Sequence, residues 1–364
     1  MQHLRYILIV LAGFAGVASA AHYTLPPQDS VVGQIQVVES WPGVDLFDIA
    51  RFYQLGLNQI ATANPGMDPL RHGHYRTVVV PTEFVLPDAP REGIVINMPE
   101  MRLFYYPTPD IVYTYPLGGF QRGQTPSGRR GWAPPLGSTT ITAKVRWPWW
   151  VPPRNIAAQY FLQTGKRLPS FVPPGSDNPM GELALRTGWF GLYIHGTNEP
   201  WSVGRRESHG CFRMYPELEA RLFPLVPVGT EVRTVNQPVL VGERSGVLYI
   251  QVFRPLHAYG VQGALENRTQ SAIQGYLQEH PQWQGKIDWE RAYAAAKTPL
   301  GIPTPISLGS PSLETLLAGI PIRPYDFPPY GANANNAAPP PELSPIMVHW
   351  QGRERLWETL KPSH

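Results

Sequence analysis

The sequence is poor in cysteine, in net charge and in long hydrophobic runs. Its 364 residues include one cysteine, Cys211, so no disulfide can form within the chain. The 30 Lys and Arg residues nearly balance the 27 Asp and Glu residues, and the net charge of +3 lacks the basic excess typical of nucleic-acid-binding proteins. After residue 20, no hydrophobic run reaches the roughly 20 residues of a membrane-spanning helix. We therefore expect no nucleic-acid partner and no membrane span beyond that point.

The abundant residue types indicate a globular, turn-rich protein. Hydrophobic residues make up 43% of the chain, which is enough for a core, whereas 42 prolines and 34 glycines exclude long helical bundles and coiled coils. We expect short strands and many turns, arranged in two or three domains.

The first twenty residues predict a secretory signal. Arg5 precedes an apolar run from Tyr6 to Val17, and residues 18–20, Ala-Ser-Ala, have the small side chains of a cleavage site. A transmembrane anchor is the alternative, but the run is too short to span a bilayer. We expect residues 1–20 to be removed and the protein to be exported.

Residues 34–83 predict a small unit of their own. A strand over residues 35–38 precedes a helix over 45–53 capped by Asp45, a second helix over 57–64 and a strand over 77–80. This order resembles the LysM module, most closely in the segments at 48–53, 63–66 and 79–81. The resemblance implies recognition of a glycan that contains N-acetylglucosamine, such as peptidoglycan. A small structural cap is the alternative.

Residues 92–237 predict a mainly β domain. Its one expected helix runs from Pro216 to Phe223. A Pro and Trp cluster at 147–153 and a polar loop at 173–179 are expected to border a cleft. Apolar patterns indicate strands over 94–97, 101–106, 111–115, 139–145, 183–186, 191–195 and 231–235.

The remaining residues form a C-terminal extension and a tail. Residues 238–310 predict a strand over 247–253 and helices over 264–279 and 287–297. Residues 311–364 are rich in proline and asparagine, a composition that suits an extended or disordered chain.

Two segments carry the candidate chemistry. His195 ends an apolar strand, and the segment Ser-His-Gly-Cys begins thirteen residues later and ends at Cys211. A cysteine nucleophile requires its thiolate, and an imidazole within hydrogen-bond reach can accept the proton. Gly210 would let a substrate carbonyl approach the backbone N–H groups of the turn, which could form an oxyanion hole. These parts suit covalent acyl transfer.

The two segments, together with the turn at 125–128 and residues 149–153 and 177–179, resemble the catalytic domain of the L,D-transpeptidases (YkuD type), in particular a periplasmic subgroup. The resemblance implies a β-sandwich catalytic domain in which Cys211 is the nucleophile and His195 is the general base. It also implies that His209 shapes the turn and the tautomer network and that Ser208 hydrogen-bonds nearby. No metal and no cofactor are implied.

Arg213 departs from the family pattern, because many members carry Asn two residues after the cysteine. We expect Arg213, with Arg205 and Arg206, to bind carboxylates of an acidic stem peptide. A solvated basic loop is the alternative for Arg205 and Arg206. The other residues expected to bind substrate are Gly196, Thr197 and Trp149.

The resemblance also implies a reaction on peptidoglycan stem peptides. The thiolate would attack the carbonyl of the third stem residue, typically diaminopimelate, and expel the terminal D-Ala. The acyl group would then pass to an amine of another stem, or to the C-terminal Lys of an outer-membrane lipoprotein. Water as acceptor would make the protein an L,D-carboxypeptidase. The signal and the resemblance together predict a periplasmic location.

Two further functions fit parts of the sequence. His195, His209 and Cys211 could ligate a catalytic zinc ion, although a periplasmic zinc enzyme more often presents paired histidines on one helix. A non-catalytic wall-binding protein could hold glycan with the LysM-like unit and the Trp-rich cleft. The intact cysteine and histidine argue against this second alternative.

Overall fold

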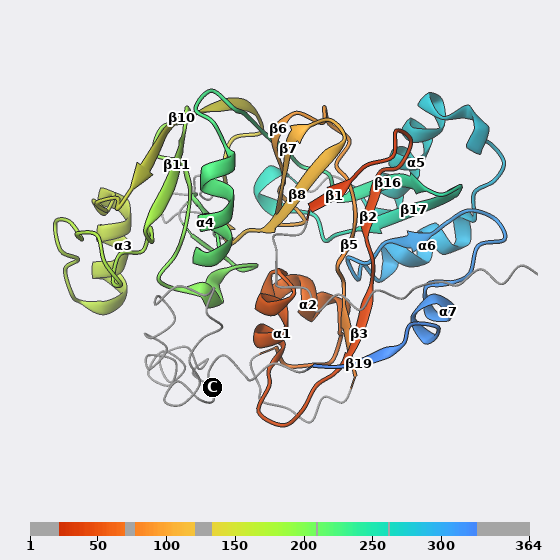
Figure 1. Ribbon diagram of the computed structural model, residues 1–364, viewed down its shortest axis with the longest axis horizontal. Helices are drawn as coiled ribbons and strands as arrows, with labels where there is room; N and C mark the ends of the chain where they lie inside the picture. The colour runs from red at the N-terminus through yellow and green to blue at the C-terminus, as the bar shows by residue number, and fades with distance from the viewer. Residues whose placement is uncertain (1–21, 70–76, 121–132, 209, 261–262, 326–364) are drawn as a thin grey trace, which may run out of the picture.

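The structure is a computed structural model that describes residues 22–69, 77–120, 133–208, 210–260 and 263–325, so the expected signal at 1–20 lies outside the described residues. The expectation of a mainly β fold is confirmed (Figure 1). Neighbours in the largest sheet run antiparallel, except for two parallel pairs described below. In spatial order its nine strands are β1 (His22–Thr24), β8 (Ile111–Pro116), β7 (Arg102–Thr108), β6 (Gly93–Asn97), β15 (Glu231–Val235), β10 (Gly137–Arg146), β11 (Leu183–Thr187), β12 (Tyr193–His195) and β14 (Phe212–Arg213).

The central strand β6 is buried on both faces, because alternate side chains enter two different cores. Ile94 and Ile96 pack in the core that includes Leu222 of helix α4 (Pro216–Leu225), whereas Val95 packs in a second core. The two parallel pairs are β6 with β15 and β12 with β14. A short parallel pair, β9 (Gly119–Phe120) with β13 (Arg206–Ser208), lies beside the main sheet.

The predicted order strand, helix, helix, strand is present in the N-terminal module, residues 34–83. It consists of β3 (Gln36–Glu39), α1 (Leu46–Phe52), α2 (Leu57–Ala63) and β4 (Val78–Val80), with β3 antiparallel to β4. Asp45 caps α1 as expected, because its carboxylate accepts from the backbone N–H of Asp48 while the Asp48 side chain accepts from Asp45.

The module shares its core with the main sheet. Ile49 and Leu46 of α1 lie in one cluster with Val95 and Phe104 of the sheet. Charged contacts add to this packing, because Arg102 Nη2 donates to the Gln54 carbonyl at 3.0 Å and to Gln59 Oε1 at 3.1 Å. The contact of α1 with α4 is also charged. The guanidinium of Arg51 donates to both carboxylate oxygens of Glu217, at 2.7 and 2.9 Å. The module is therefore packed as part of the same body as the main sheet.

The C-terminal extension has its own core. A three-stranded sheet of β16 (Val239–Arg244), β17 (Val247–Val252) and β18 (Thr304–Pro305) packs against α5 (Leu265–Glu279) and α6 (Trp289–Lys297). Both helices were expected; β16 was not, and it pairs with β17 across a turn at residues 245–246, both of which have positive φ. The pair β2 (Val31–Gly33) with β5 (Glu83–Val85) joins this extension to the rest, because the Val85 N–H donates to Gln251 Oε1 at 2.8 Å. Short 3₁₀ helices lie at Pro200–Ser202, His257–Tyr259 and Pro281–Trp283.

Two segments have more regular structure than the sequence predicted. The main domain has a second helix, α3 (Arg154–Thr164), whose Ala, Gln and Leu residues favour helix; it begins after Pro153 and ends at Gly165 with φ 69°. The tail is also ordered up to residue 325. It forms α7 (Leu313–Ala318) and β19 (Ile322–Pro324), and β19 pairs parallel with β3. Burial of the Tyr325 ring and the hydrogen bond from Trp41 Nε1 to its carbonyl hold this end in place. Residues 326–364 lie outside the described residues.

None of the described helices is both long enough and apolar enough to cross a membrane.

We predict that Gly204→Ala weakens the docking of the module. Gly204 has φ +87°, and a Cβ there would lie 2.2 Å from the backbone N of Leu57, which donates to the Val203 carbonyl at 3.1 Å. Gly229→Ala is the matched control, since Gly229 has φ +93° but open space around it. Thermal unfolding should show a loss for Gly204→Ala that exceeds the control by about 1–3 kcal/mol, the usual cost of overpacking. Equal losses would mean that the contact with Leu57 contributes nothing.

Candidate active site

The parallel pairing of β12 and β14 brings the two chemical segments together. Ile194 lies opposite Phe212, and His195 lies opposite Arg213. Because in-register residues of parallel strands point to the same face, Ile194 and Phe212 both enter the core, while His195 and Arg213 share the other face. Cys211 is the residue before β14 and, by the same alternation, lies on the face of His195 and Arg213.

The His195 ring is buried and held in one tautomer. Its Nδ1 lies 2.5 Å from the Gly196 carbonyl, which can only accept, so Nδ1 carries the hydrogen of the neutral ring and Nε2 is its basic nitrogen. Burial, reinforced by the positive charge of Arg213, lowers the pKa of His195 to about 4. Hydrogen bonds to the Gly196 and Met180 backbone act in the opposite direction. The imidazole is therefore neutral at neutral pH, as a general base must be.

The Cys211 thiol is protonated in this state. Burial raises its pKa, although a hydrogen bond with the Tyr193 backbone and the charge of Arg213 act against that rise. The sulfur donates to the Gly191 carbonyl at 3.4 Å, in the turn that precedes β12. Gly210, just before the cysteine, has φ +121°, a conformation that glycine adopts without strain. Both groups are thus in their neutral forms in this state, rather than a preformed thiolate and imidazolium.

Arg213 places a positive charge next to His195 and Cys211. Its Nη1 lies 3.2 Å from Glu199 Oε2, and both side chains are partly exposed. Its charge lowers the pKa values of His195 and of Cys211 together. When the thiol transfers its proton to the imidazole, Arg213 stabilises the thiolate that remains. The same positive charge repels the imidazolium that forms.

The other predicted residues do not all lie as expected. Gly196 uses its carbonyl to orient His195, and the buried Thr197 hydroxyl accepts from the Glu199 N–H at 3.0 Å. Arg206 Nη2 donates to the Pro99 carbonyl at 3.5 Å. Ser208 ends β13, and His209 lies outside the described residues.

Trp149, the remaining predicted residue, lies in the Trp-rich loop after β10. Its side chain is 60% exposed and lies against the Phe171 ring, with centroids 5.4 Å apart. Arg205, of the same predicted basic set as Arg206, stacks on Trp201 with its guanidinium carbon 5.2 Å from the ring centroid. Arg205 therefore packs on the Trp201 ring, in the segment just before β13.

The sequence analysis missed Glu219 of α4. Its carboxyl is buried against Gly196: a hydrogen bond with the Gly196 backbone lowers its pKa, but burial raises that pKa well above the usual value. A helical plot of α4 would have revealed it, because Glu219 lies on the face of Tyr215, Leu222 and Phe223, all buried. Asn178 lies in the segment 177–179 that carries part of the family resemblance; its buried amide donates to the Pro148 carbonyl at 2.7 Å and so ties the polar loop to the Trp-rich loop.

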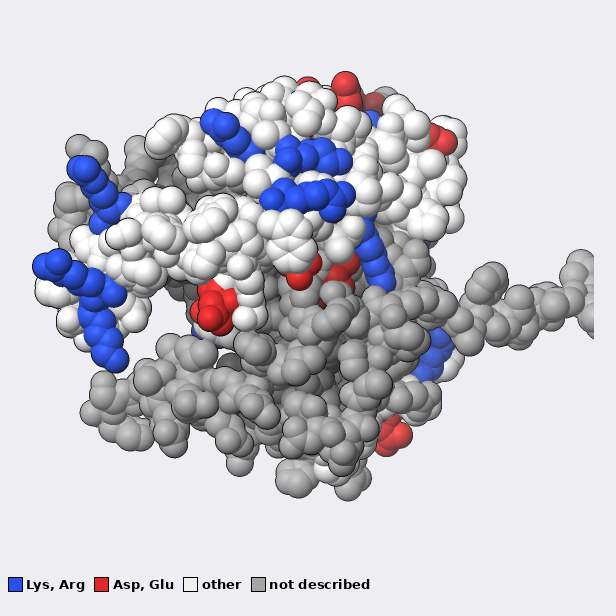
Figure 2. Space-filling model, turned by 60° about the vertical axis from the view of Figure 1, so that its left-hand side comes forward, with Lys and Arg blue, Asp and Glu red and all other residues white. Residues whose placement is uncertain are grey.

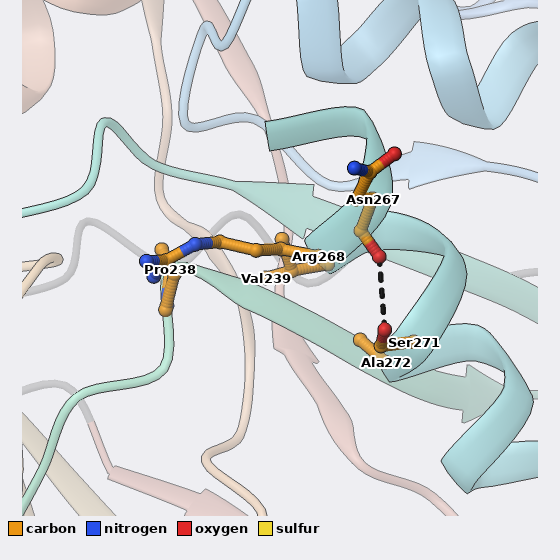
Figure 3. A pocket seen from close by; sticks show the side chains of 6 residues that line it. All are labelled: Pro238, Val239, Asn267, Arg268, Ser271 and Ala272. Atoms are coloured by element: carbon orange, nitrogen blue, oxygen red, sulfur yellow. Dashed lines mark hydrogen bonds between the residues drawn. The ribbon is translucent and has the colours of Figure 1, made fainter. Parts of the chain in front are cut away.

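A shallow, open pocket lies away from these residues (Figure 3). It has a volume of about 330 Å³, lies between the start of β16 and helix α5, and contains none of the site residues. Its lining residues are Pro238, Val239, Asn267, Arg268, Ser271 and Ala272.

The alternative of a zinc site required His209 as a third ligand beside His195 and Cys211. In the described part of the chain, no three His, Cys, Asp or Glu side chains are grouped as metal ligands.

Fold and site together define the class: a mainly β, cysteine-dependent acyltransferase. Residues 91–239 match the family model of the YkuD L,D-transpeptidase catalytic domain. Probable L,D-transpeptidase YbiS of Escherichia coli K12 is 41% identical over 252 residues, which cover 68% of this chain and 79% of that protein. Probable L,D-transpeptidase ErfK/SrfK of the same strain is 37% identical over 299 residues, 80% of this chain and 92% of that protein.

Solved structures are more distant. The catalytic domain of the Enterococcus faecium L,D-transpeptidase is 17% identical, covers 41% of this chain and 100% of that chain, and gives a TM-score of 0.30. An L,D-transpeptidase from Mycobacterium tuberculosis H37Rv is 19% identical over 43% of this chain and 61% of that chain, with a TM-score of 0.27. On the evidence of the sequence relatives, the chain belongs to the L,D-transpeptidase family.

We predict that the His195 imidazole titrates near pH 4 and that Arg213→Gln moves this titration upward. Removal of the positive charge stabilises the imidazolium, so the pKa should rise by about one pH unit or less. NMR titration of the imidazole protons measures it, with the signal assigned from its loss in His195→Gln. Arg233→Gln, which removes a cation paired with Glu231 on β15, should leave the titration unchanged. A wild-type value near 6.5 would contradict the burial argument.

We predict that Glu219→Gln stabilises the protein at alkaline pH. The raised pKa means that the folded state keeps a proton that the unfolded state releases above about pH 4.5, so the wild type loses stability as pH rises. Glutamine retains the acceptor oxygen without ionising. The variant's melting temperature should exceed that of the wild type at about pH 8 and approach it below about pH 4.5. The exposed Glu290→Gln is the control, and a pH-independent difference would refute the idea.

Proposed function

We propose that Cys211 is the nucleophile and His195 the general base of L,D-transpeptidation on peptidoglycan stem peptides. The observation that carries the proposal is the shared face of β12 and β14, on which a neutral, tautomer-fixed imidazole lies beside the thiol-bearing strand. The Gly196 carbonyl would act as the third member of the set, because it holds the Nδ1 hydrogen and leaves Nε2 for the thiol proton.

In the first step, Nε2 of His195 takes the thiol proton as the sulfur of Cys211 attacks the carbonyl carbon of the third stem residue. The carbon–sulfur bond forms, and the backbone N–H groups at Gly210 and Cys211 stabilise the oxyanion. The bond to the terminal D-Ala nitrogen then breaks, and the imidazolium returns its proton to that amine. A thioester and free D-Ala result.

In the second step an acceptor amine attacks the thioester, His195 takes its proton, and the thiol is restored. We propose a diaminopimelate side chain of another stem as acceptor, which makes a cross-link, or the C-terminal Lys of an outer-membrane lipoprotein. Water in the same position would give an L,D-carboxypeptidase. Arg213 would bind a stem carboxylate, since its guanidinium is partly exposed and donates to Glu199 through Nη1.

We propose further that the N-terminal module binds the glycan and that the enzyme works in the periplasm. The βααβ order of the module and its resemblance to LysM support the first point. The exposed Trp41 ring, in the loop between β3 and α1, offers a surface on which a sugar could stack. The signal-like residues 1–20 support the second.

The test compares the mature wild type with Cys211→Ala and His195→Asn. Intact-protein mass spectrometry after incubation with a carbapenem should show a single adduct on the wild type and none on Cys211→Ala. His195→Asn should acylate about 10²- to 10⁴-fold more slowly, the usual contribution of a general base. Arg233→Gln serves as a folded control that should acylate at the wild-type rate.

Turnover of disaccharide-tetrapeptide then identifies the acceptor. Cross-linked dimer with free D-Ala supports the transpeptidase, whereas tripeptide alone supports the carboxypeptidase. A folded wild type that forms no adduct and releases no D-Ala would overturn the mechanism and leave the wall-binding alternative.

A further inference from the structure

The near-neutral total charge hides a strongly one-sided segment. Residues 111–176 contain no Asp or Glu, although they hold eight Lys and Arg residues, and the segment is bounded by Asp110 and Asp177. In the structure it includes β10, α3 and the loops beside them, which project at one end of the molecule (Figure 1). We call β10, α3 and the loop up to residue 176 the arm.

The arm also exposes an unusual number of large apolar side chains. Leu162 is 77% exposed and Val151 66%, and neither lies in a core cluster. Such side chains gain free energy only when another apolar phase covers them. The others are Trp147, Trp149, Phe161 and Phe171.

Cations stand at both ends of α3 among these apolar groups. Arg154 opens the helix, and Lys166 and Arg167 follow its end; all three are exposed. None of the three forms an ion pair with a carboxylate among the described residues. Figure 2 turns this end of the molecule forward and shows Lys and Arg side chains standing out from a surface that is otherwise mostly white. The charges are therefore available to an anionic partner.

We propose that the arm docks on the surface of an anionic phospholipid bilayer. Interfacial membrane contacts combine apolar side chains that enter the acyl boundary with Lys and Arg that meet the headgroup phosphates, and tryptophan is favoured at that depth. A glycan strand would use the Trp and Phe rings but gain nothing from Leu162 and Val151, which have no ring face for a sugar. The aliphatic groups thus favour the bilayer as the partner.

Docking through the arm would hold the active site close to the membrane. Strand β10 pairs with β11, and β11 pairs with β12, which ends in His195. Asn178 fixes the loop after the arm to the Trp-rich loop, so the arm and the site are joined by backbone pairing and by a buried amide. Acceptors anchored in the same membrane would then lie within reach of the thioester.

The test is sedimentation of the full mature chain with vesicles. Binding to vesicles of phosphatidylcholine with about one third phosphatidylglycerol should be at least about tenfold tighter than to phosphatidylcholine alone, and salt should weaken it. Lys166→Gln/Arg167→Gln and, separately, Leu162→Ser should each reduce binding severalfold. The control variants lie outside the arm, all at exposed positions. Arg254→Gln/Arg323→Gln removes two positive charges, as Lys166→Gln/Arg167→Gln does, and Leu308→Ser matches Leu162→Ser.

Carbapenem acylation by each variant at the wild-type rate shows that the site is folded, so the vesicle result stands apart from the proposed mechanism. The proposal is overturned if the wild type does not bind anionic vesicles, or if the arm variants bind as the controls do. Arm-dependent binding to purified peptidoglycan sacculi without vesicle binding would also overturn it, because the surface would then belong to the wall polymer.

Discussion

The parallel pairing of β12 with β14 is the constraint on which the site depends. With Ile194 and Phe212 committed to the core by their apolar side chains, alternation leaves His195, Arg213 and the preceding cysteine on one face. A slip of one residue in either strand would bury charge and expose the core, so the register is strongly specified. The chemistry of the face therefore follows from the burial of its opposite side.

Burial also sets the electrostatics of that face. It lowers the pKa of His195 and raises that of Cys211, so both groups rest in their neutral forms, and Arg213 shifts both pKa values downward. The Gly196 peptide is held from two sides, because its carbonyl meets His195 Nδ1 and its backbone meets the Glu219 carboxyl. Glu219, a buried carboxyl whose pKa is raised, is thus a second contact of the peptide that orients the base.

The rest of the chain supports the loop that leads to the cysteine. Gly204 touches Gly56 and Leu57 at the start of α2, and the Arg51–Glu217 pair ties α1 to the helix that carries Glu219. Strand β19 adds a third strand to the module from the far end of the chain. The N-terminal module is consequently a brace for the active site as well as a candidate glycan-binding unit.

Local signals in the sequence were sufficient for many of the helices and strands and for singling out His195 and Cys211 as candidates. The cap at Asp45, the apolar runs of β6 and β7, and the Ser-His-Gly-Cys segment each involve residues close along the chain, so local pattern and motif identify them. The tertiary structure alone decided which distant groups meet: Glu219 with Gly196, Arg102 with Gln54, and β19 with β3. It also placed Arg206 against Pro99 and turned the Thr197 hydroxyl inward. These contacts depend on how separate segments pack against one another. The alternation of apolar and polar residues in a sequence specifies that one face of a strand or helix is buried, but it does not specify which other segment covers that face.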